Sequence, residues 1–137
     1  MVERLLLVIV LFALGLAAYC LVRRCNLRRA GASAPTDPIL SSFRPGTPAV
    51  VYFTTPGCVP CRTQQQPALA RLQTELGDRI QVIQIDAAQD PDAARRWGVF
   101  TAPTTFILDG RGQPRDVNHG VADAPKLRRQ IEATALR

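Results

Sequence analysis

The chain has 137 residues, of which 47% are hydrophobic and 20% are charged, so its composition is that of a folded protein and excludes a largely disordered one. The net charge of +6 is unevenly placed, because residues 1–29 hold five arginines and one glutamate, whereas the rest of the chain holds twelve basic and ten acidic side chains. Nucleic-acid binding needs a clustered basic face, so the nearly balanced remainder argues against a nucleic acid as partner.

The first segment of the chain is an apolar run without charges from Leu5 to Val22. A helix over this run would cover most of the ~30 Å hydrocarbon layer of a membrane. A cleaved signal peptide is the alternative, with Gly15-Leu16-Ala17 as a weak cleavage site. The apolar run continues past Ala17 and then meets four arginines, which favours a retained anchor within residues 1–29.

The arginines that follow the run also predict its orientation. Arg23, Arg24, Arg28 and Arg29 outnumber the single Arg4 on the other side. The positive-inside rule therefore predicts a single-pass protein with its N-terminus outside and its domain on the cytoplasmic face. An extracytoplasmic domain, anchored or secreted, is the alternative. Near the edge of the run, Cys20 and Cys25 are compatible with lipidation or with two reduced thiols.

Residues 30–43 are rich in alanine, serine and proline, and they predict a flexible linker without regular structure. Ile39, Leu40 and Phe43 are the apolar side chains in it that could pack onto a domain. The length of the chain allows one compact domain beside the anchor, and we place this domain at residues 44–137.

Within the domain the patterns predict strand, helix, strand, helix, strand, strand and helix. The expected strands are 49–53, 80–86, 104–109 and 113–118. The expected helices are 58–76, kinked at Pro67, a second from Asp90 to Trp97-Gly98, and a last one capped by Asp123 with Leu127, Ile131 and Ala135 on its inner face.

Cys58 and Cys61 lie two residues apart where the first strand passes into the first helix. The first thiol is placed at unpaired backbone N–H groups and the positive end of the helix dipole, which favour the thiolate, the reactive form. The second thiol lies one helical turn on and is close enough to close a disulfide. A zinc site would need four ligands. Only Cys20, Cys25 and His119 remain to supply them, so redox chemistry is favoured.

With these elements placed, the chain from about residue 44 to its end resembles the thioredoxin superfamily. The residues that carry the resemblance are Cys58-Val59-Pro60-Cys61 after the first strand, Ala102-Pro103-Thr104 before the third, and Gly120 after the fourth. The resemblance implies an α/β fold with a four-stranded mixed sheet flanked by helices, without the family's leading strand and helix.

The resemblance also implies the roles of individual residues. Pro103 would follow a cis peptide bond and face the dithiol, and Ala102, Pro103 and Gly120 would bind an extended substrate segment. The active-site loop around the two cysteines would consist of Gly57, Val59 and Pro60.

Four positions depart from the family pattern. Gly57 stands where many members have tryptophan, and Tyr52 stands where many have a buried acid that accepts the proton of the second thiol. Val82 lies near the place of a partner lysine, and Pro67 follows the second cysteine by six residues in place of five. These departures leave the proton acceptor of Cys61 and the reduction potential open.

The predicted function is that of a membrane-anchored thiol–disulfide oxidoreductase that exchanges disulfides with protein substrates. Cys58 would attack and Cys61 would resolve, with no cofactor beyond this redox-active pair. The electrons would come from a dithiol donor, such as a thioredoxin reductase-type system or a membrane redox partner. The alternatives are a metal chaperone or metal-site maturation factor that uses the dithiol as ligands, and a structural adaptor in which the dithiol is incidental.

Overall fold

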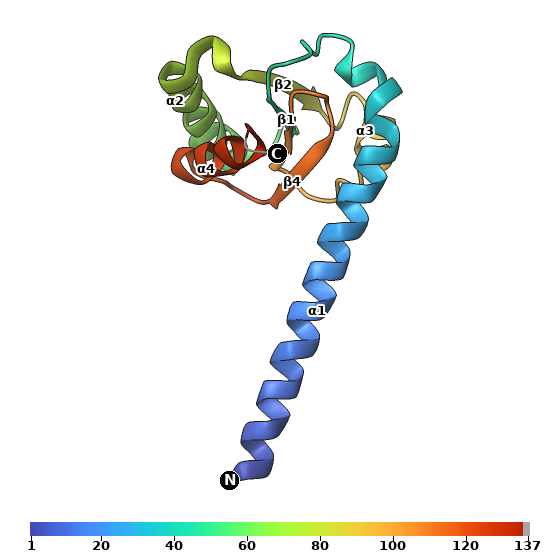
Figure 1. Cartoon of the computed structure of the whole chain (residues 1–137), viewed down its shortest axis with the longest axis vertical. Coiled ribbons are helices and arrows are strands. Elements are labelled where there is room, and N and C mark those ends of the chain that lie inside the picture. Colours follow the sequence, from blue (N-terminus) through green and yellow to red (C-terminus); the bar gives the residue numbers. More distant parts are fainter. Residues whose placement is uncertain (136–137) are drawn as a thin grey trace.

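The structure is a computed structural model that describes residues 1–135 and consists of a long N-terminal helix and a domain built on one sheet (Figure 1). The helices are α1 (Val2–Ser33), α2 (Gln66–Leu76), α3 (Pro91–Arg96) and α4 (Ala124–Ala135). The strands are β1 (Ala49–Thr54), β2 (Gln81–Asp86), β3 (Thr104–Leu108) and β4 (Pro114–His119).

The strands form one mixed sheet in the order β2-β1-β3-β4. β1 pairs with β2 in parallel and with β3 antiparallel, and β3 pairs antiparallel with β4. Every residue of β1 is buried, since this strand is central and helices cover both faces of the sheet. The predicted four-stranded mixed sheet flanked by helices is therefore confirmed, with strand ends that differ from the expected ones by about one residue.

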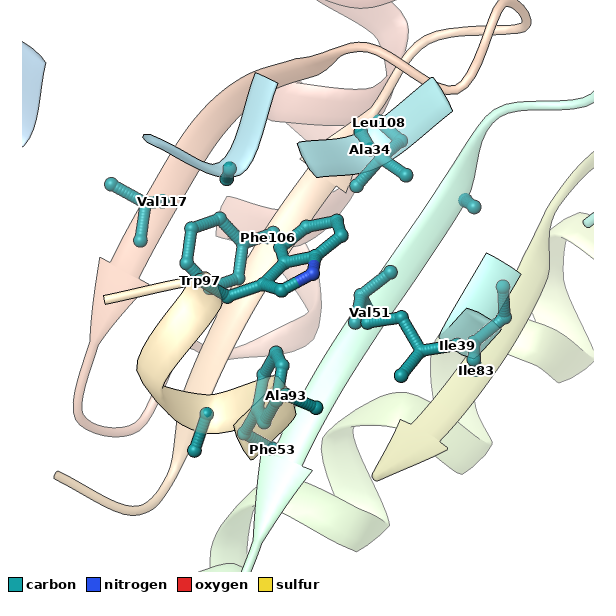
Figure 2. Close-up of a cluster of buried hydrophobic side chains, with 13 residues drawn as sticks. Ala34, Ile39, Val51, Phe53, Ile83, Ala93, Trp97, Phe106, Leu108 and Val117 are labelled. Carbon is teal, nitrogen blue, oxygen red and sulfur yellow. The ribbon is translucent and has the colours of Figure 1, made fainter. Parts of the chain in front are cut away.

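One face of the sheet carries an aromatic core, shown in Figure 2. The rings of Phe53, Trp97 and Phe106 have centroids 5.1 to 6.1 Å apart and meet in tilted or edge-on arrangements. Such geometries are favoured for aromatic pairs because the ring edge is positive and the ring face negative. The C-terminal part of α1 contributes Ala30 and Ala34 to the same cluster.

The opposite face of the sheet is covered by α2 and α4. Leu72 of α2 and Leu127 of α4 are fully buried there. The predicted inner face of the last helix is confirmed for Leu127 and Ile131 but is wrong for Ala135, which is exposed. Thr134 is buried instead, and its hydroxyl donates to the carbonyl of Ile131 at 2.7 Å, so burial leaves no unpaired polar group.

Residues 30–43 are not the flexible linker that their composition predicts. α1 continues through residue 33, and two 3-10 turns follow at Ala34–Thr36 and Pro38–Leu40. Ala30, Ala34 and Ile39 are buried. Alanine has the highest helix propensity, and its small side chain lets a helix approach a sheet closely, so a stretch that looks like a linker is packed against the domain.

The predicted helix over residues 58–76 is interrupted near its start. It begins at Val59, passes through a π-helical turn at Cys61–Gln65 and continues as α2. The N–H of Gln66 donates to the carbonyl of Cys61, which is the i→i−5 bond of a π turn. This turn absorbs one extra residue and brings Pro67 into the first turn of α2, where a missing N–H costs little. The π turn thus accommodates Pro67, which follows Cys61 by six residues in place of five.

The predicted helix caps are confirmed. Asp90 accepts from the N–H of Ala93 at 2.9 Å, and Asp123 accepts from the N–H of Lys126 at 2.8 Å. Gly98 ends α3 with a φ of +66°, in the left-handed region that favours glycine. The last two residues of the domain predicted at 44–137 lie outside the described residues.

Candidate active site

The dithiol is held where β1 leaves the sheet. Thr55-Pro56-Gly57 turns the chain, and the N–H of Cys58 closes this turn by donating to the carbonyl of Thr55 at 3.1 Å. Cys58 and Cys61 form a disulfide with their Cα atoms 5.3 Å apart, within the usual span of such bonds. The two cysteines that the sequence singles out are thus joined at the start of the helical segment.

The two sulfurs have different surroundings. Cys58 retains 8% of its surface exposed, whereas Cys61 is fully buried. The backbone N–H of Cys61 donates to the Sγ of Cys58 at 3.2 Å. Once the disulfide is reduced, this donor would stabilise negative charge on Cys58, because a hydrogen bond to the charged form favours that form. The geometry therefore suits Cys58 as the sulfur that meets a substrate.

The predicted substrate-binding residues lie together beside this pair. The Ala102–Pro103 peptide bond is cis, as the resemblance implies, and Ala102 packs against the core cluster that contains both cysteines. The N–H of Gly120 donates to the carbonyl of Pro103 at 2.8 Å. Gly120 has a φ of +91°, a conformation that side chains disfavour, so glycine suits this position.

Three exposed apolar side chains, here called the apolar rim, belong to the loops that adjoin the dithiol. Val59 is 57% exposed, Phe100 is 80% exposed and Val121 is 40% exposed, and outside α1 these are the large hydrophobic residues exposed in the described part of the chain. They come from the active-site loop, the loop before Pro103 and the loop after Gly120. Single exposed hydrophobic residues are ordinary, but three around one reactive group are typical of a binding surface.

A cavity of about 330 Å³ opens beside the apolar rim. Thr55, Phe100 and Ala102 line it together with residues of α3. Its walls are mostly apolar, which suits an apolar side chain as the occupant.

Tyr52 lies behind the dithiol, in the same core cluster. The residue is fully buried, and among residues 1–135 its hydroxyl finds no hydrogen-bond partner. Burial raises the pKa of Tyr52 and outweighs the opposing effect of the neighbouring Thr54 and Gln66, so the phenol stays neutral around pH 7. The buried carboxylates among residues 1–135 are Asp37 and Asp109, and each is bonded to an arginine, so neither is available to receive the proton of Cys61.

Gln65 is a site-supporting residue that sequence reasoning missed. Its buried amide donates from Nε2 to the carbonyl of Ala122 at 3.1 Å and accepts from the N–H of Ala122 at 2.9 Å. These two bonds hold the loop after Gly120 against the helical segment of the dithiol. The available signal was its spacing, because Gln65 lies four residues after Cys61 and four before Leu69, on the buried face of the helix.

Other candidate ligands lie away from the dithiol. His119 is exposed and shares the face of β4 with Val117, opposite the face that covers the cysteines, and its Nε2 lies 3.3 Å from the Nδ2 of Asn26 on α1. Cys20 and Cys25 are exposed on α1. Among residues 1–135 there is no group of three or more histidine, cysteine or acidic side chains that could hold a metal ion.

Comparisons with known proteins agree on one family. A family model described as Thioredoxin matches residues 39–133. A thioredoxin of Rhodospirillum rubrum is 36% identical over 87 residues, which cover 64% of this chain and 82% of that protein. The chloroplastic thioredoxin Y of rice, Oryza sativa subsp. japonica, is 35% identical over 63% of this chain, and the match spans 50% of the length of the rice protein. The X-ray structure of Fasciola hepatica thioredoxin superposes with a TM-score of 0.57 at 29% identity, covering 66% of this chain and 83% of that one.

Proposed function

The chain belongs to the thioredoxin family, and from this premise we propose that it is a thiol–disulfide oxidoreductase that exchanges disulfides with protein substrates. The observation that carries the proposal is the Cys58–Cys61 disulfide, with a backbone N–H directed at the more exposed sulfur. The apolar rim and the neighbouring cavity support a protein segment as the substrate.

In the proposed reaction the reduced Cys58 thiolate attacks one sulfur of a target disulfide. A mixed disulfide forms, and the displaced target thiolate takes up a proton from water. Cys61 then loses its proton and attacks the Sγ of Cys58, which closes the Cys58–Cys61 disulfide and releases the second target thiolate. Two electrons pass to the target, and the sulfurs hold them without any further cofactor.

The second step has a consequence for this chain. Because both buried carboxylates of the described chain are bonded to arginines, we propose that the proton of Cys61 leaves through water. The pair would be returned to its reduced form by the reverse exchange with a dithiol donor, either a thioredoxin reductase-type system or a membrane redox partner.

We further propose that α1 anchors the protein in a membrane. This helix is long and apolar enough to cross a bilayer, with a mean hydropathy of 2.9 over its most apolar window and no part of that window buried. Signal sequences share these properties, and the arginines Arg23, Arg24, Arg28 and Arg29 favour a retained anchor with the domain on the cytoplasmic face. In this arrangement residues 1–29 anchor the chain, the packed residues 30–43 join them to the domain, and residues 44–137 carry the exchange.

The exchange is tested by equilibrium titration against glutathione and by reduction of insulin. We expect a reversible two-electron transition and insulin reduction that disappears in Cys58→Ser. A dithiol pair that does not cycle, or insulin reduction that survives the substitution, would contradict the proposal.

The metal content of the purified protein separates an oxidoreductase from a metal chaperone, which would retain a thiolate-bound metal. A C-terminal reporter active only outside the cytoplasm tests the orientation, and we expect it to stay inactive.

A further inference from the structure

The direction in which α1 joins the domain is set by contacts at two levels. Asn26 lies against His119 and Gly98, and Arg23, three residues nearer the apolar run, pairs with Asp116. Further along the helix, Gly31 lies beside Gln113. Because β4 runs from Pro114 to His119, α1 crosses it obliquely and in the opposite direction, as Figure 1 also shows.

The strand end that Asn26 meets is the end that carries the dithiol. His119 pairs with Thr104 at the start of β3, and Thr104 pairs with Phe53 near the end of β1. From this edge the chain passes into the turn before Cys58. The apolar rim, the cis Ala102–Pro103 bond and the dithiol therefore adjoin the edge of the sheet at which β4 ends. In Figure 1 the end of β4 is at the lower side of the domain, the side from which α1 runs toward its N-terminus.

The connection between anchor and domain is continuous and packed against the domain. α1 is one unbroken helix from Val2 to Ser33, and it enters the core of the domain through the fully buried Ala30. Arg23 forms an ion pair with Asp116 on β4, directly after the apolar run. The domain is thus held at a set height and rotation relative to the anchor.

The height follows from helix geometry. Asn26 lies four residues beyond Val22, the last residue of the apolar run, which corresponds to about 6 Å along the helix axis. The polar headgroup layer on one side of a bilayer is about 5–8 Å thick. With α1 as a membrane anchor, the edge of the sheet that carries the dithiol would therefore be at the level of the headgroups or just above them.

We propose that the dithiol is presented to the membrane surface and exchanges with disulfides in juxtamembrane segments of other integral membrane proteins. The proposal rests on the proposed function and on the anchor. A large soluble protein would have to enter the narrow space between the apolar rim and the bilayer, whereas a short segment that leaves the bilayer nearby lies at the right height. The exchange needs no reactant beyond the two disulfide–dithiol pairs.

The test uses the full chain, with Cys20→Ser and Cys25→Ser to remove the other thiols, in vesicles of phosphatidylcholine and phosphatidylglycerol. Two transmembrane peptides serve as probes. One carries a disulfide-closed loop directly after its apolar segment, and the other carries the same loop on a rigid helical spacer about 27 Å long. The reduced protein is mixed with each oxidised probe, and the appearance of probe thiols is followed. We expect the near loop to react at least about ten-fold faster, because its effective concentration at the dithiol is higher.

An insertion of seven helix-forming, charged residues between Val22 and Arg23 provides the decisive variant. It raises the domain by about 10 Å and turns it by only about 20°, because seven residues make nearly two helical turns. We expect the near-loop rate to fall about ten-fold and the far-loop rate to rise. The same insertion before Leu5 is the matched control, because it leaves the height of the domain unchanged and should alter neither rate.

Reduction of insulin in detergent, measured for every variant, separates the two proposals. Loss of insulin reduction in the parent protein would overturn the proposed function and this inference with it. If insulin is reduced but the two loops react equally, or the insertion after Val22 changes neither rate, the exchange function stands and the inference is overturned. Failure of the protein to float with the vesicles would overturn it as well.

Discussion

The indole of Trp97 donates a hydrogen bond from its Nε1 to the Oδ2 of Asp37 over 2.9 Å, although the two residues lie sixty positions apart. The same carboxylate accepts from the Nε and Nη2 of Arg96, each at 2.9 Å, and from the N–H of Ile39 at 3.2 Å. The side chain of Asp37 is completely covered. These bonds fasten the segment after α1 to the end of α3 and so help to hold the anchor to the domain.

Removal of this carboxylate should destabilise the fold. We expect Asp37→Ala to lower the free energy of unfolding by about 2–4 kcal/mol, since it leaves the buried indole N–H and a partly covered guanidinium without their acceptor. Asp37→Asn keeps one acceptor oxygen and should cost less. Urea unfolding in detergent, followed by the fluorescence of Trp97, the only tryptophan of the chain, measures both variants. An unfolding midpoint of Asp37→Ala equal to that of the wild type would contradict the assignment.

The same group predicts a pH dependence. Burial alone would raise the pKa of Asp37, but the hydrogen bonds from Arg96, Ile39 and Trp97 outweigh burial and lower it. The unfolded chain therefore binds the proton more readily than the folded one. Stability contributed by the ionised group is complete above the ordinary aspartate value of about 3.9 and is lost as the pH falls through the lower, folded value.

We accordingly expect the free energy of unfolding to decrease as the pH is lowered from about 5 toward 2. Asp109 contributes in the same direction, because bonds from Gln113, Arg115 and Arg111 outweigh its burial and lower its pKa. Asp37→Asn should flatten the pH dependence in part, and Asp37→Asn combined with Asp109→Asn should flatten it further. Denaturation curves at a series of pH values provide the measurement. If the free energy of unfolding changes with pH equally in the wild type, the single variant and the double variant, the two aspartates are not the cause of the pH dependence.

The roles of the two cysteines predict an asymmetry in trapping. With Cys61→Ser the mixed disulfide at Cys58 cannot be resolved, so covalent adducts with target proteins should accumulate. With Cys58→Ser the remaining thiol is fully buried, and few adducts should form. Non-reducing gels and mass spectrometry of the purified protein detect the adducts and identify the targets. Equal trapping by both variants would contradict any difference in role between the two cysteines. Trapping by Cys58→Ser alone would show that their roles are reversed.

Gln65 should contribute to stability by holding the loop after Gly120. We expect Gln65→Leu to reduce the free energy of unfolding by about 2–3 kcal/mol, because the buried N–H and carbonyl of Ala122 both lose their partner. Gln64→Leu is the matched control, since Gln64 lies on the same π turn but is exposed and should change stability by less than about 0.5 kcal/mol. Urea unfolding compares them, and similar losses in the two variants would show that the amide bonds are not responsible.

We expect the substitution Tyr52→Phe not to destabilise the fold. Its buried hydroxyl has no hydrogen-bond partner among the described residues, so Tyr52→Phe removes a polar group that burial disfavours. We expect the free energy of unfolding to stay the same or to rise by about 1 kcal/mol. The rate of insulin reduction should not change if water accepts the proton of Cys61. A marked fall in that rate would instead assign the phenol a part in proton transfer.

The amino-acid sequence by itself determined the features that depend on short stretches of chain. The position of Cys58 and Cys61 at a strand-to-helix junction, the caps at Asp90 and Asp123, and the turn at Gly98 were all predicted and are all present. Each of them arises from a residue's own backbone preference or from a partner a few positions away. Alternating and helical periodicity likewise placed the four strands and the main helices to within a few residues.

The tertiary structure decided the features that depend on partners far along the chain. Residues 30–43 have the composition of a linker, but Ala30 and Ala34 are buried on the sheet and Asp37 is bound to Trp97. Likewise, the direction in which α1 meets β4, and hence the side on which the dithiol faces, depends on contacts between Asn26 and His119, which are 93 positions apart. The local sequence does not determine these contacts. Whether a small or polar side chain stabilises the fold depends on which distant residues the folded chain places against it.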